Sequence, residues 1–339
     1  MKPKRILIVQ TAFLGDVILA TPLIRAVREL FPDSFISFLL IPETKRVLDN
    51  NPHLNEVLTY DKRTKAGVGA FLQIVNRVRG KDLDLALVPH RSFRSALLAG
   101  LARIPFRIGF DKSAGSFLLT RKVPYRSDVH EVERNLSLVS EFNPPAQDFL
   151  PELFPSSDDL SSVRKMLTDS GVREQDKVVA VAPGSVWATK RWLPERFAQV
   201  CDLLMSRARV KVVLTGSEDD LALCRQIAGL MKEKPVILAG RTDVLQSAAL
   251  VSLCRAVLSN DSAPVHMASA MRKPVVTVFG STVPELGFSP YRVGHVIVQK
   301  ELDCRPCGIH GKKKCPKEHF KCMKEITTDE VFEAVLSLI

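Results

Sequence analysis

The sequence has few aromatic residues: they make up 6% of its 339 residues and include only three tyrosines and two tryptophans. Because bases stack on aromatic rings at many nucleic-acid interfaces, this scarcity argues against a nucleic-acid-binding protein. The apolar residues are mostly Leu, Val, Ile and Ala, which suits packed layers of helices and sheet. The formal net charge of +11 nevertheless favours an anionic partner, such as a nucleic acid, a membrane surface or a phosphorylated substrate.

The chain also lacks an apolar run long enough to span a membrane. The apolar run Ile6–Val9 is too short for a signal peptide, and Asp16 follows where a cleavage region would be expected. We therefore expect a cytoplasmic protein, in which the seven cysteines are thiols or metal ligands rather than disulfides. The glycine-rich pattern GxGxxG is missing after the first predicted strand, so a nicotinamide or flavin site is not supported.

Strands and helices alternate along the chain, which predicts parallel, doubly wound α/β sheets. Proline and serine are concentrated between residues 143 and 157, and this composition predicts a linker between two domains. The predicted domains cover residues 1–150 and 151–325, the second with a cysteine-rich loop at residues 304–322, and a C-terminal helix occupies residues 326–339. Ligands of such sheets bind beyond the carboxyl ends of the strands, so polar residues that follow strands are the candidates.

In the first domain, Gly15-Asp16 follows the predicted strand Arg5–Val9. Asp16 is either a helix N-cap or a general base whose carboxylate the helix start keeps ionised. Basic residues follow two later strands: Lys62, Arg63 and Lys65 lie in one loop, and Arg91 and Arg94 follow another strand. They either form a solvated basic face or hold an anionic acceptor, and the candidates for the second role are Arg63, Arg91 and Arg94.

In the second domain, the turn after the predicted strand Val178–Ala182 contains Gly184, Ser185 and Lys190. The glycine and serine bring N–H and hydroxyl groups close to an anion, and the lysine suits a diphosphate. Glu218 follows the next strand, where it either accepts hydrogen bonds from a ribose diol or is an ordinary acid at a helix start.

The stretch Ala256–Thr282 predicts a strand, a polar turn, a helix that includes His266, and another buried strand. Asp261 or Ser262 is expected to cap the helix, and Pro264 fits its first turn. The remaining N–H groups form a seat for phosphate. The alternative is an ordinary crossover with a good N-cap.

Three segments occur in this order on the two similar halves of the chain: LGDVILATPLIRAVR, PGSVWATKRWLPERF and SNDSAPVHMASAMRKPVVTVFGST. Together they resemble the ADP-heptose:lipopolysaccharide heptosyltransferases of glycosyltransferase family 9, and most of all the heptosyltransferase II type. The resemblance implies a GT-B architecture, in which two Rossmann-like domains face each other across a cleft. It implies an acceptor on the first domain, an ADP-sugar on the second, and a last helix that packs back on the first. It also implies inverting transfer without a catalytic metal or other cofactor.

Matched by position, the resemblance makes Asp16 the catalytic base, Lys190 the phosphate-binding lysine and Glu218 the ribose-binding acid. The loop and helix start that hold the diphosphate and sugar match Asp261, Ser262, Ala263 and His266. Many members have glycine in place of Ala263, which would be strained here if its φ had to be positive. The implied partners are ADP-heptose and a phosphorylated lipid A–Kdo inner-core acceptor, met at the cytoplasmic face of the inner membrane, and no nucleic acid is expected.

The last part of the chain contains the pattern C-x2-C-x7-C-x6-C. Its cysteines either bind a structural zinc ion or stay reduced in a compact basic loop, and they are Cys304, Cys307, Cys315 and Cys322. Two further functions compete with heptose transfer. One is a GT-B enzyme that uses another nucleotide sugar, as a glycosyltransferase or an epimerase. The other is a nucleic-acid-binding protein with a zinc-binding tail.

Overall fold

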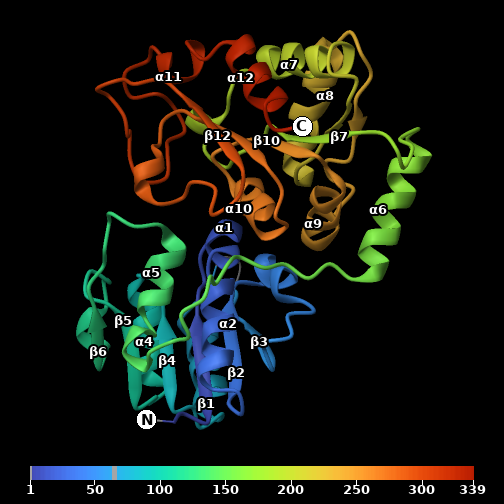
Figure 1. Cartoon of the computed structure of the whole chain (residues 1–339). Coiled ribbons are helices and arrows are strands. Elements are labelled where there is room, and N and C mark those ends of the chain that lie inside the picture. Colours follow the sequence, from blue (N-terminus) through green and yellow to red (C-terminus); the bar gives the residue numbers. More distant parts are fainter. Residues whose placement is uncertain (1, 63–66) are drawn as a thin grey trace. The chain divides into compact units, whose positions relative to one another are not determined.

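The computed structural model describes residues 2–62 and 67–339 and divides the chain into two compact units, Met1–Phe154 and Pro155–Ile339. Each unit contains one six-stranded parallel sheet with helices packed against it, as Figure 1 shows. The predicted α/β fold class of two Rossmann-like domains, the GT-B class, is therefore confirmed. Arg63, one of the predicted acceptor residues, lies outside the described residues.

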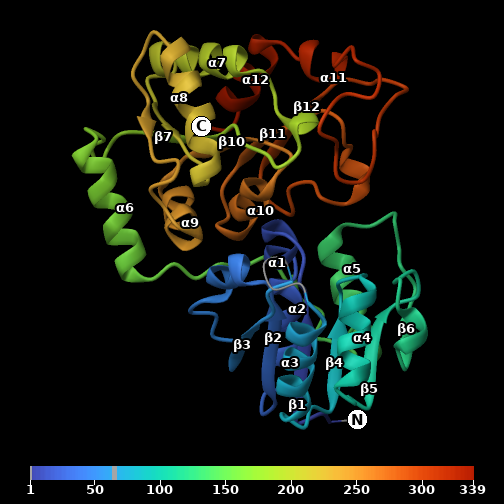
Figure 2. The same cartoon turned by 180° about the vertical axis from the view of Figure 1, so that it is seen from behind.

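The first sheet has the strand order β3-β2-β1-β4-β5-β6. Its strands are β1 (Arg5–Val9), β2 (Phe35–Leu40), β3 (Glu56–Thr59), β4 (Leu85–Val88), β5 (Phe106–Phe110) and β6 (Arg121–Val123). Its helices are α1 (Leu14–Ile18), α2 (Thr21–Leu30), α3 (Val68–Arg79), α4 (Phe93–Leu101) and α5 (Glu131–Ser137). Figures 1 and 2 show α2 and α5 on one face of this sheet and α3 and α4 on the other.

The second sheet has the order β12-β11-β10-β7-β8-β9. Its strands are β7 (Val178–Ala182), β8 (Lys211–Leu214), β9 (Val236–Ile237), β10 (Ala256–Asn260), β11 (Val275–Phe279) and β12 (His295–Gln299). The helices are α6 (Ser157–Asp169), α7 (Pro194–Ser206), α8 (Leu221–Leu230), α9 (Val244–Leu253), α10 (Ala263–Ala270), α11 (Lys321–Lys324) and α12 (Thr328–Leu336). Helices α7, α8 and α12 pack together, as do α6, α9 and α10.

The C-terminal helix α12 packs on α7 and on strands β11 and β12. Its buried residues Val331, Phe332 and Val335 belong to the hydrophobic core of the second unit. Leu, Val and Ile from the facing strands complete that core, as expected for a parallel sheet covered on both faces. The predicted return of this helix to the first domain stays a prediction.

Apolar residues recur at helical spacing from Val17 to Phe31, which predicts one helix that begins at Asp16. The structure has two helices there, α1 and α2, so this prediction is wrong. The interruption follows from Pro22, which has no N–H group and whose ring would clash with the carbonyl of Ile18 in a continuous helix. Side chains, instead of backbone N–H groups, donate hydrogen bonds to the carbonyl groups at this break. The Thr21 hydroxyl donates to Ile18 O at 2.7 Å, and Asn135 Nδ2 of α5 donates to Leu19 O at 3.1 Å.

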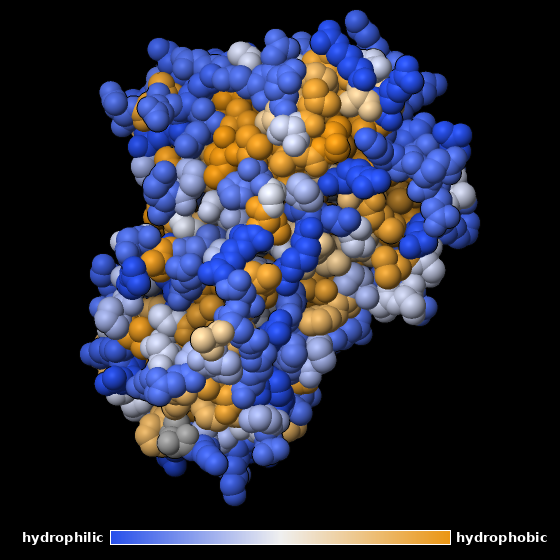
Figure 3. All heavy atoms as spheres, viewed as in Figure 1, coloured by the Kyte–Doolittle hydropathy of each residue, from blue (hydrophilic) through white to orange (hydrophobic). Residues whose placement is uncertain are grey.

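Hydrophilic side chains cover much of the face drawn in Figure 3, with apolar side chains in patches between them. Within the described ranges, the helices are all too short or too polar to cross a bilayer. The cores of the two units hold most of the large apolar side chains, and three cysteines, Cys201, Cys224 and Cys254, are buried among them.

Candidate functional site

The predicted donor-binding residues of the second unit all follow the carboxyl ends of neighbouring strands. Lys190 follows β7, Glu218 follows β8, and Asp261 follows β10. Because β10, β7 and β8 are adjacent in a parallel sheet, their carboxyl ends lie along one edge. The sheet therefore brings together residues that are more than 70 positions apart in the sequence (190 and 261).

Lys190 and Asp261 form a largely buried ion pair, with 2.6 Å between Nζ and Oδ2 and side-chain exposures of 13% and 5%. The same carboxylate oxygen accepts a hydrogen bond from the Thr282 hydroxyl at 2.6 Å. Asp261 thus holds the ammonium group in one position at the sheet edge. Sequence reasoning missed Thr282, although it follows β11, the next strand of the sheet, and this placement is the signal that could have identified it.

Helix α10 begins at Ala263, directly after Asp261 and Ser262. The prediction that Asp261 or Ser262 caps this helix is wrong. Ser262 occupies the N-cap position, and among the described residues its side chain makes no hydrogen bond to the first N–H groups of the helix. Ser262 instead donates to Gly184 O at 3.4 Å, and Asp261 is bound to Lys190. Because Ala263 is the first helical residue, its methyl group causes no strain there. His266 lies in the same helix and is buried, with its ring 6.5 Å from that of Phe288.

The turn after β7 approaches the turn after β8 very closely. A Cβ atom added at Gly184 would lie 2.1 Å from Asp220 Oδ1, so any other residue at this position would require the Asp220 carboxylate to move. The Asp220 carboxylate is itself held by the N–H and hydroxyl of Ser217, at 2.9 and 2.8 Å. Ser185 is buried beside this contact, and its carbonyl accepts from Arg191 Nε at 2.7 Å.

Glu218 is exposed at the start of a short 3-10 helix, Glu218–Asp220. Its carboxylate lies over Gly240, where an added Cβ would be 2.5 Å from Oε2 and where φ is +74°. A carboxylate in this position is accessible to a ligand, and its assignment to a ribose stays a prediction.

In the first unit, Asp16 is the third residue of α1 and not the N-cap, which is Phe13. Asp16 Oδ2 accepts a hydrogen bond from the Phe13 N–H at 3.1 Å. The carboxylate is therefore held at the positive end of the helix, close to the carboxyl end of β1, and is partly exposed. This arrangement suits a carboxylate that must be ionised to accept a proton.

A buried ion pair that the sequence did not suggest lies near Asp16. Glu131 Oε2 and Arg134 Nη1 of α5 are 2.9 Å apart, with side-chain exposures of 9% and 2%. Arg134 also donates to the Tyr125 hydroxyl at 2.6 Å. Burial raises the pKa of the Glu131 carboxyl to about 7, the Arg134 charge opposes this rise, and the Asp16 charge adds to it.

This raised pKa predicts how stability depends on pH. The carboxyl of Glu131 titrates near pH 4.5 in the unfolded chain and near 7 in the folded one, so folding takes up a proton between these values. We expect the free energy of unfolding to fall by about 2 kcal/mol between pH 5.5 and 8 from this group alone. Urea unfolding of the wild type and of Glu131→Gln at several pH values measures this change, and the variant should lose this part of the pH dependence of its free energy of unfolding. The same pH dependence in both proteins would contradict the raised pKa of Glu131.

The basic residues after β4 occupy different surroundings. Arg91 is exposed, with its guanidinium 4.1 Å from the centre of the Tyr125 ring, and Arg94 lines a pocket together with Lys62. His90 lies between hydroxyl groups, 2.9 Å from both Thr11 Oγ1 and Ser95 Oγ. Burial lowers the pKa of His90 to about 4, helped by the charges of Lys62 and Arg91, so its ring is neutral at pH 7.

The cysteine-rich loop is tied to the turn that carries Lys190. Thr189 N donates to Lys312 O at 3.1 Å, and Lys312 N donates to Thr189 Oγ1 at 2.8 Å. Cys304 Sγ lies 3.8 Å from His319 Nε2. Nowhere in residues 2–62 and 67–339 do three His, Cys, Asp or Glu side chains converge as a metal site requires. Structural zinc at Cys304, Cys307, Cys315 and Cys322 stays a prediction.

Comparison with known proteins gives consistent results over the whole chain. The model of glycosyltransferase family 9 (heptosyltransferase) matches residues 71–320. Lipooligosaccharide heptosyltransferase 2 of Haemophilus ducreyi is 27% identical, with 99% of both chains covered. Lipopolysaccharide heptosyltransferase 3 of Escherichia coli is 30% identical, covering 79% of this chain and 80% of its own. The structure of E. coli ADP-heptose lps heptosyltransferase II superposes with a TM-score of 0.80 at 23% identity, covering 98% of both chains.

Proposed function

This chain belongs to glycosyltransferase family 9, the heptosyltransferases, and from that membership we propose that it transfers heptose from ADP-heptose to the inner core of lipopolysaccharide, as the heptosyltransferase II type. The observation that carries the proposal is the convergence of Lys190, Asp261 and the start of α10 at one sheet edge. A buried ammonium and a helix start together favour a diphosphate. The names of the relatives support heptose as the sugar and a lipopolysaccharide core as the acceptor.

In the proposed complex the adenosine ribose lies at Glu218 and the diphosphate at Lys190. The N–H groups at the start of α10 and the backbone of Gly184 and Ser185 add donors to the phosphate oxygens. Asp261, paired with Lys190 in the ligand-free chain, keeps the ammonium in place. His266 of α10 is placed near the sugar-phosphate linkage.

The proposed reaction is a single displacement with inversion. The Asp16 carboxylate takes the proton of an acceptor hydroxyl while that oxygen forms a bond to the anomeric carbon of the heptose. The bond between this carbon and the diphosphate oxygen breaks, and ADP leaves with the electron pair. Lys190 and the helix N–H groups stabilise the negative charge that develops on the diphosphate, which is the work that a metal ion does in other transferases.

Transfer measured with ADP-heptose and lipid A–Kdo-type acceptors, in EDTA, tests the proposal. We expect the folded chain to form the heptosylated product without added divalent metal. Activity with another nucleotide sugar but not with ADP-heptose would mean that the chain is a glycosyltransferase with a different donor. Salt-sensitive binding to DNA or RNA without any transfer would favour the nucleic-acid alternative.

A further inference from the structure

The outer face of helix α4, in the first unit, is apolar. Figure 2 shows α4 beside α3, on the face of the sheet that these two helices cover. Phe93, Leu97 and Leu101 lie four positions apart and so share one side of the helix, where Phe93 is 43% and Leu101 is 39% exposed. Arg94 is the only charged residue among the nine of this helix. A surface helix normally presents polar side chains to water, so this face is suited to contact something other than water.

The loop after β5 extends this apolar face. Phe117 is 71% exposed, and the centre of its ring lies 6.3 Å from that of Phe93. Gly115 lets the loop approach the helix closely, because a Cβ atom added there would lie 2.7 Å from Ala96 Cβ. Leu118 of the same loop also packs beside α4. We call the resulting set of side chains the α4 surface, and it consists of Phe93, Leu97, Leu101, Phe117 and Leu118.

The charges around the α4 surface are almost all positive. The segment of residues 89–127 contains eight lysines and arginines but one acidic residue, Asp111. The Asp111 carboxylate accepts hydrogen bonds from Lys112 N and Tyr125 N at 2.7 and 2.8 Å, so the backbone already occupies it. The cations that adjoin the apolar residues in the sequence are exposed, and they are Arg91, Arg94, Arg103 and Lys112. Apolar rings among charges of one sign fit an anionic lipid surface, which takes up the rings and attracts the cations.

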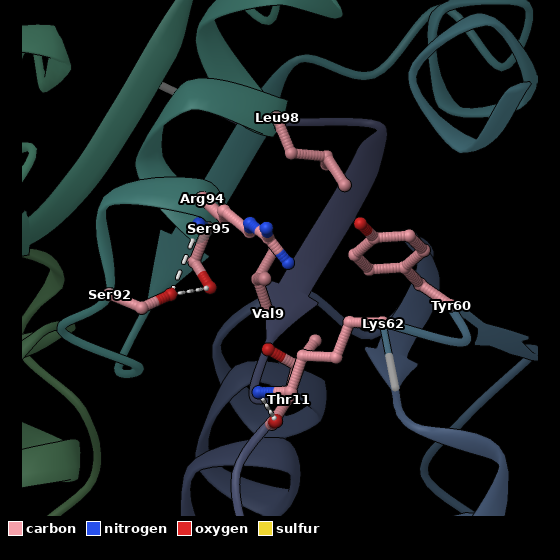
Figure 4. Close-up of a pocket in the computed structure, with 8 residues that line it drawn as sticks. All are labelled: Val9, Thr11, Tyr60, Lys62, Ser92, Arg94, Ser95 and Leu98. Carbon is pink, nitrogen blue, oxygen red and sulfur yellow. Dashed lines mark hydrogen bonds between the residues drawn. The ribbon is translucent and has the colours of Figure 1, made fainter. Parts of the chain in front are cut away.

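From these features we propose that the α4 surface binds an anionic lipid bilayer. The rings of Phe93 and Phe117 enter the boundary between head groups and acyl chains, and the surrounding cations meet the lipid phosphates. Arg94 of the same helix lines the pocket drawn in Figure 4, so a bound membrane lies beside the carboxyl edge of the first sheet. That the membrane presents the acceptor at this edge rests on the proposed function. Binding to lipid depends only on the α4 surface.

Co-sedimentation of the whole chain with lipid vesicles is the first test. One set of vesicles contains phosphatidylcholine and phosphatidylglycerol in equal amounts, and the other contains phosphatidylcholine alone. We expect at least about tenfold tighter binding to the anionic vesicles, and weaker binding as the salt concentration is raised. Equal binding to both sets of vesicles, or no binding to either, would overturn the proposal.

A double variant locates the contact on the α4 surface. Phe93→Ser with Phe117→Ser should weaken binding to the anionic vesicles at least about tenfold, because two rings no longer leave water for lipid. The matched control is Leu230→Ser with Leu336→Ser, which removes side chains that are 49% and 42% exposed on the second unit. This control should change binding less than about twofold. Circular dichroism checks that both double variants are folded, and an equal loss of binding in the two would contradict the assignment.

A charge reversal tests the electrostatic part of the contact. Lys112→Glu should weaken binding to the anionic vesicles about tenfold, because it places a negative charge beside the lipid phosphates. Lys234→Glu makes the same change at an exposed position of the second unit and should weaken binding less than about threefold. If the two reversals have equal effects, the net charge of the chain determines binding and the α4 surface does not.

The other occupant to be tested is a second copy of this chain. Analytical ultracentrifugation without lipid compares the wild type with the double variant Phe93→Ser with Phe117→Ser. We expect the same molecular mass for both proteins. A wild-type dimer that this variant dissociates would make the α4 surface an interface between copies, and the proposal would fail.

A transfer assay then separates this inference from the proposed function. The double variant Phe93→Ser with Phe117→Ser should transfer heptose to a deacylated, water-soluble acceptor at the wild-type rate. With the same acceptor acylated and embedded in anionic vesicles, its rate should fall about tenfold. If the wild type binds vesicles through the α4 surface but transfers no heptose, the proposed function fails and the membrane contact stands. If the variant matches the wild type with both acceptors, the proposed function stands and the membrane contact fails.

Discussion

Asp16→Asn should lower kcat for heptose transfer by about 10²- to 10⁴-fold, the usual contribution of a general base. The substitution removes the negative charge and the ability to take a proton, while the side chain keeps its size. Its amide oxygen can still accept the hydrogen bond from the Phe13 N–H, so the start of α1 should persist. The Kd for ADP-heptose should be unchanged, because the residues assigned to the donor lie in the second unit.

Single-turnover transfer and donor titration of the same preparations make this measurement. Asp33→Asn is the matched control, since it removes an exposed carboxylate from the same unit and should leave kcat as in the wild type. Because the Asp16 charge helps to raise the pKa of Glu131, Asp16→Asn should also lower that pKa, which NMR can follow independently of activity. Unimpaired transfer by Asp16→Asn would leave Asp16 with the role of stabilising the first turn of α1.

The sheets, and the convergence of the candidate donor residues at one sheet edge, were predictable because both depend on local pattern. Short runs of Val, Ile, Leu and Ala between turns identified β1 and β7 with their exact ends, Arg5–Val9 and Val178–Ala182. Parallel strands place their carboxyl ends along one edge, so residues that follow them converge without any knowledge of packing. Lys190 and Asp261, paired at 2.6 Å, are the result.

The features that the sequence did not reveal depend on contacts between distant elements. Nothing in the pattern around Glu131 and Arg134 shows that both side chains of α5 are buried as an ion pair. Lys62 and Arg94 belong to different segments of the chain, and only the fold shows that they line the same pocket. The break between α1 and α2 is different, because Pro22 alone should have predicted it.

Lys190→Ala should lower kcat/KM for ADP-heptose by about 10²- to 10³-fold, the effect of losing one charge that stabilises the transition state. The same substitution leaves the carboxylate of Asp261, whose side chain is 5% exposed, without its cation. Removing one partner of a buried pair costs about 3 kcal/mol or more of stability. A loss of activity in this variant alone would therefore have two explanations, weaker donor stabilisation or a damaged fold.

The double variant Lys190→Ala with Asp261→Asn separates the two explanations. It removes both charges, and the amide oxygen that replaces the Asp261 carboxylate can still accept from Thr282, so stability measured by urea unfolding should return toward the wild-type value. Transfer should not return, because the ammonium that meets the diphosphate is still missing. If kcat/KM recovers together with stability, Lys190 serves only to neutralise Asp261, and the negative charge on the departing ADP must be stabilised by the N–H groups of α10 without it.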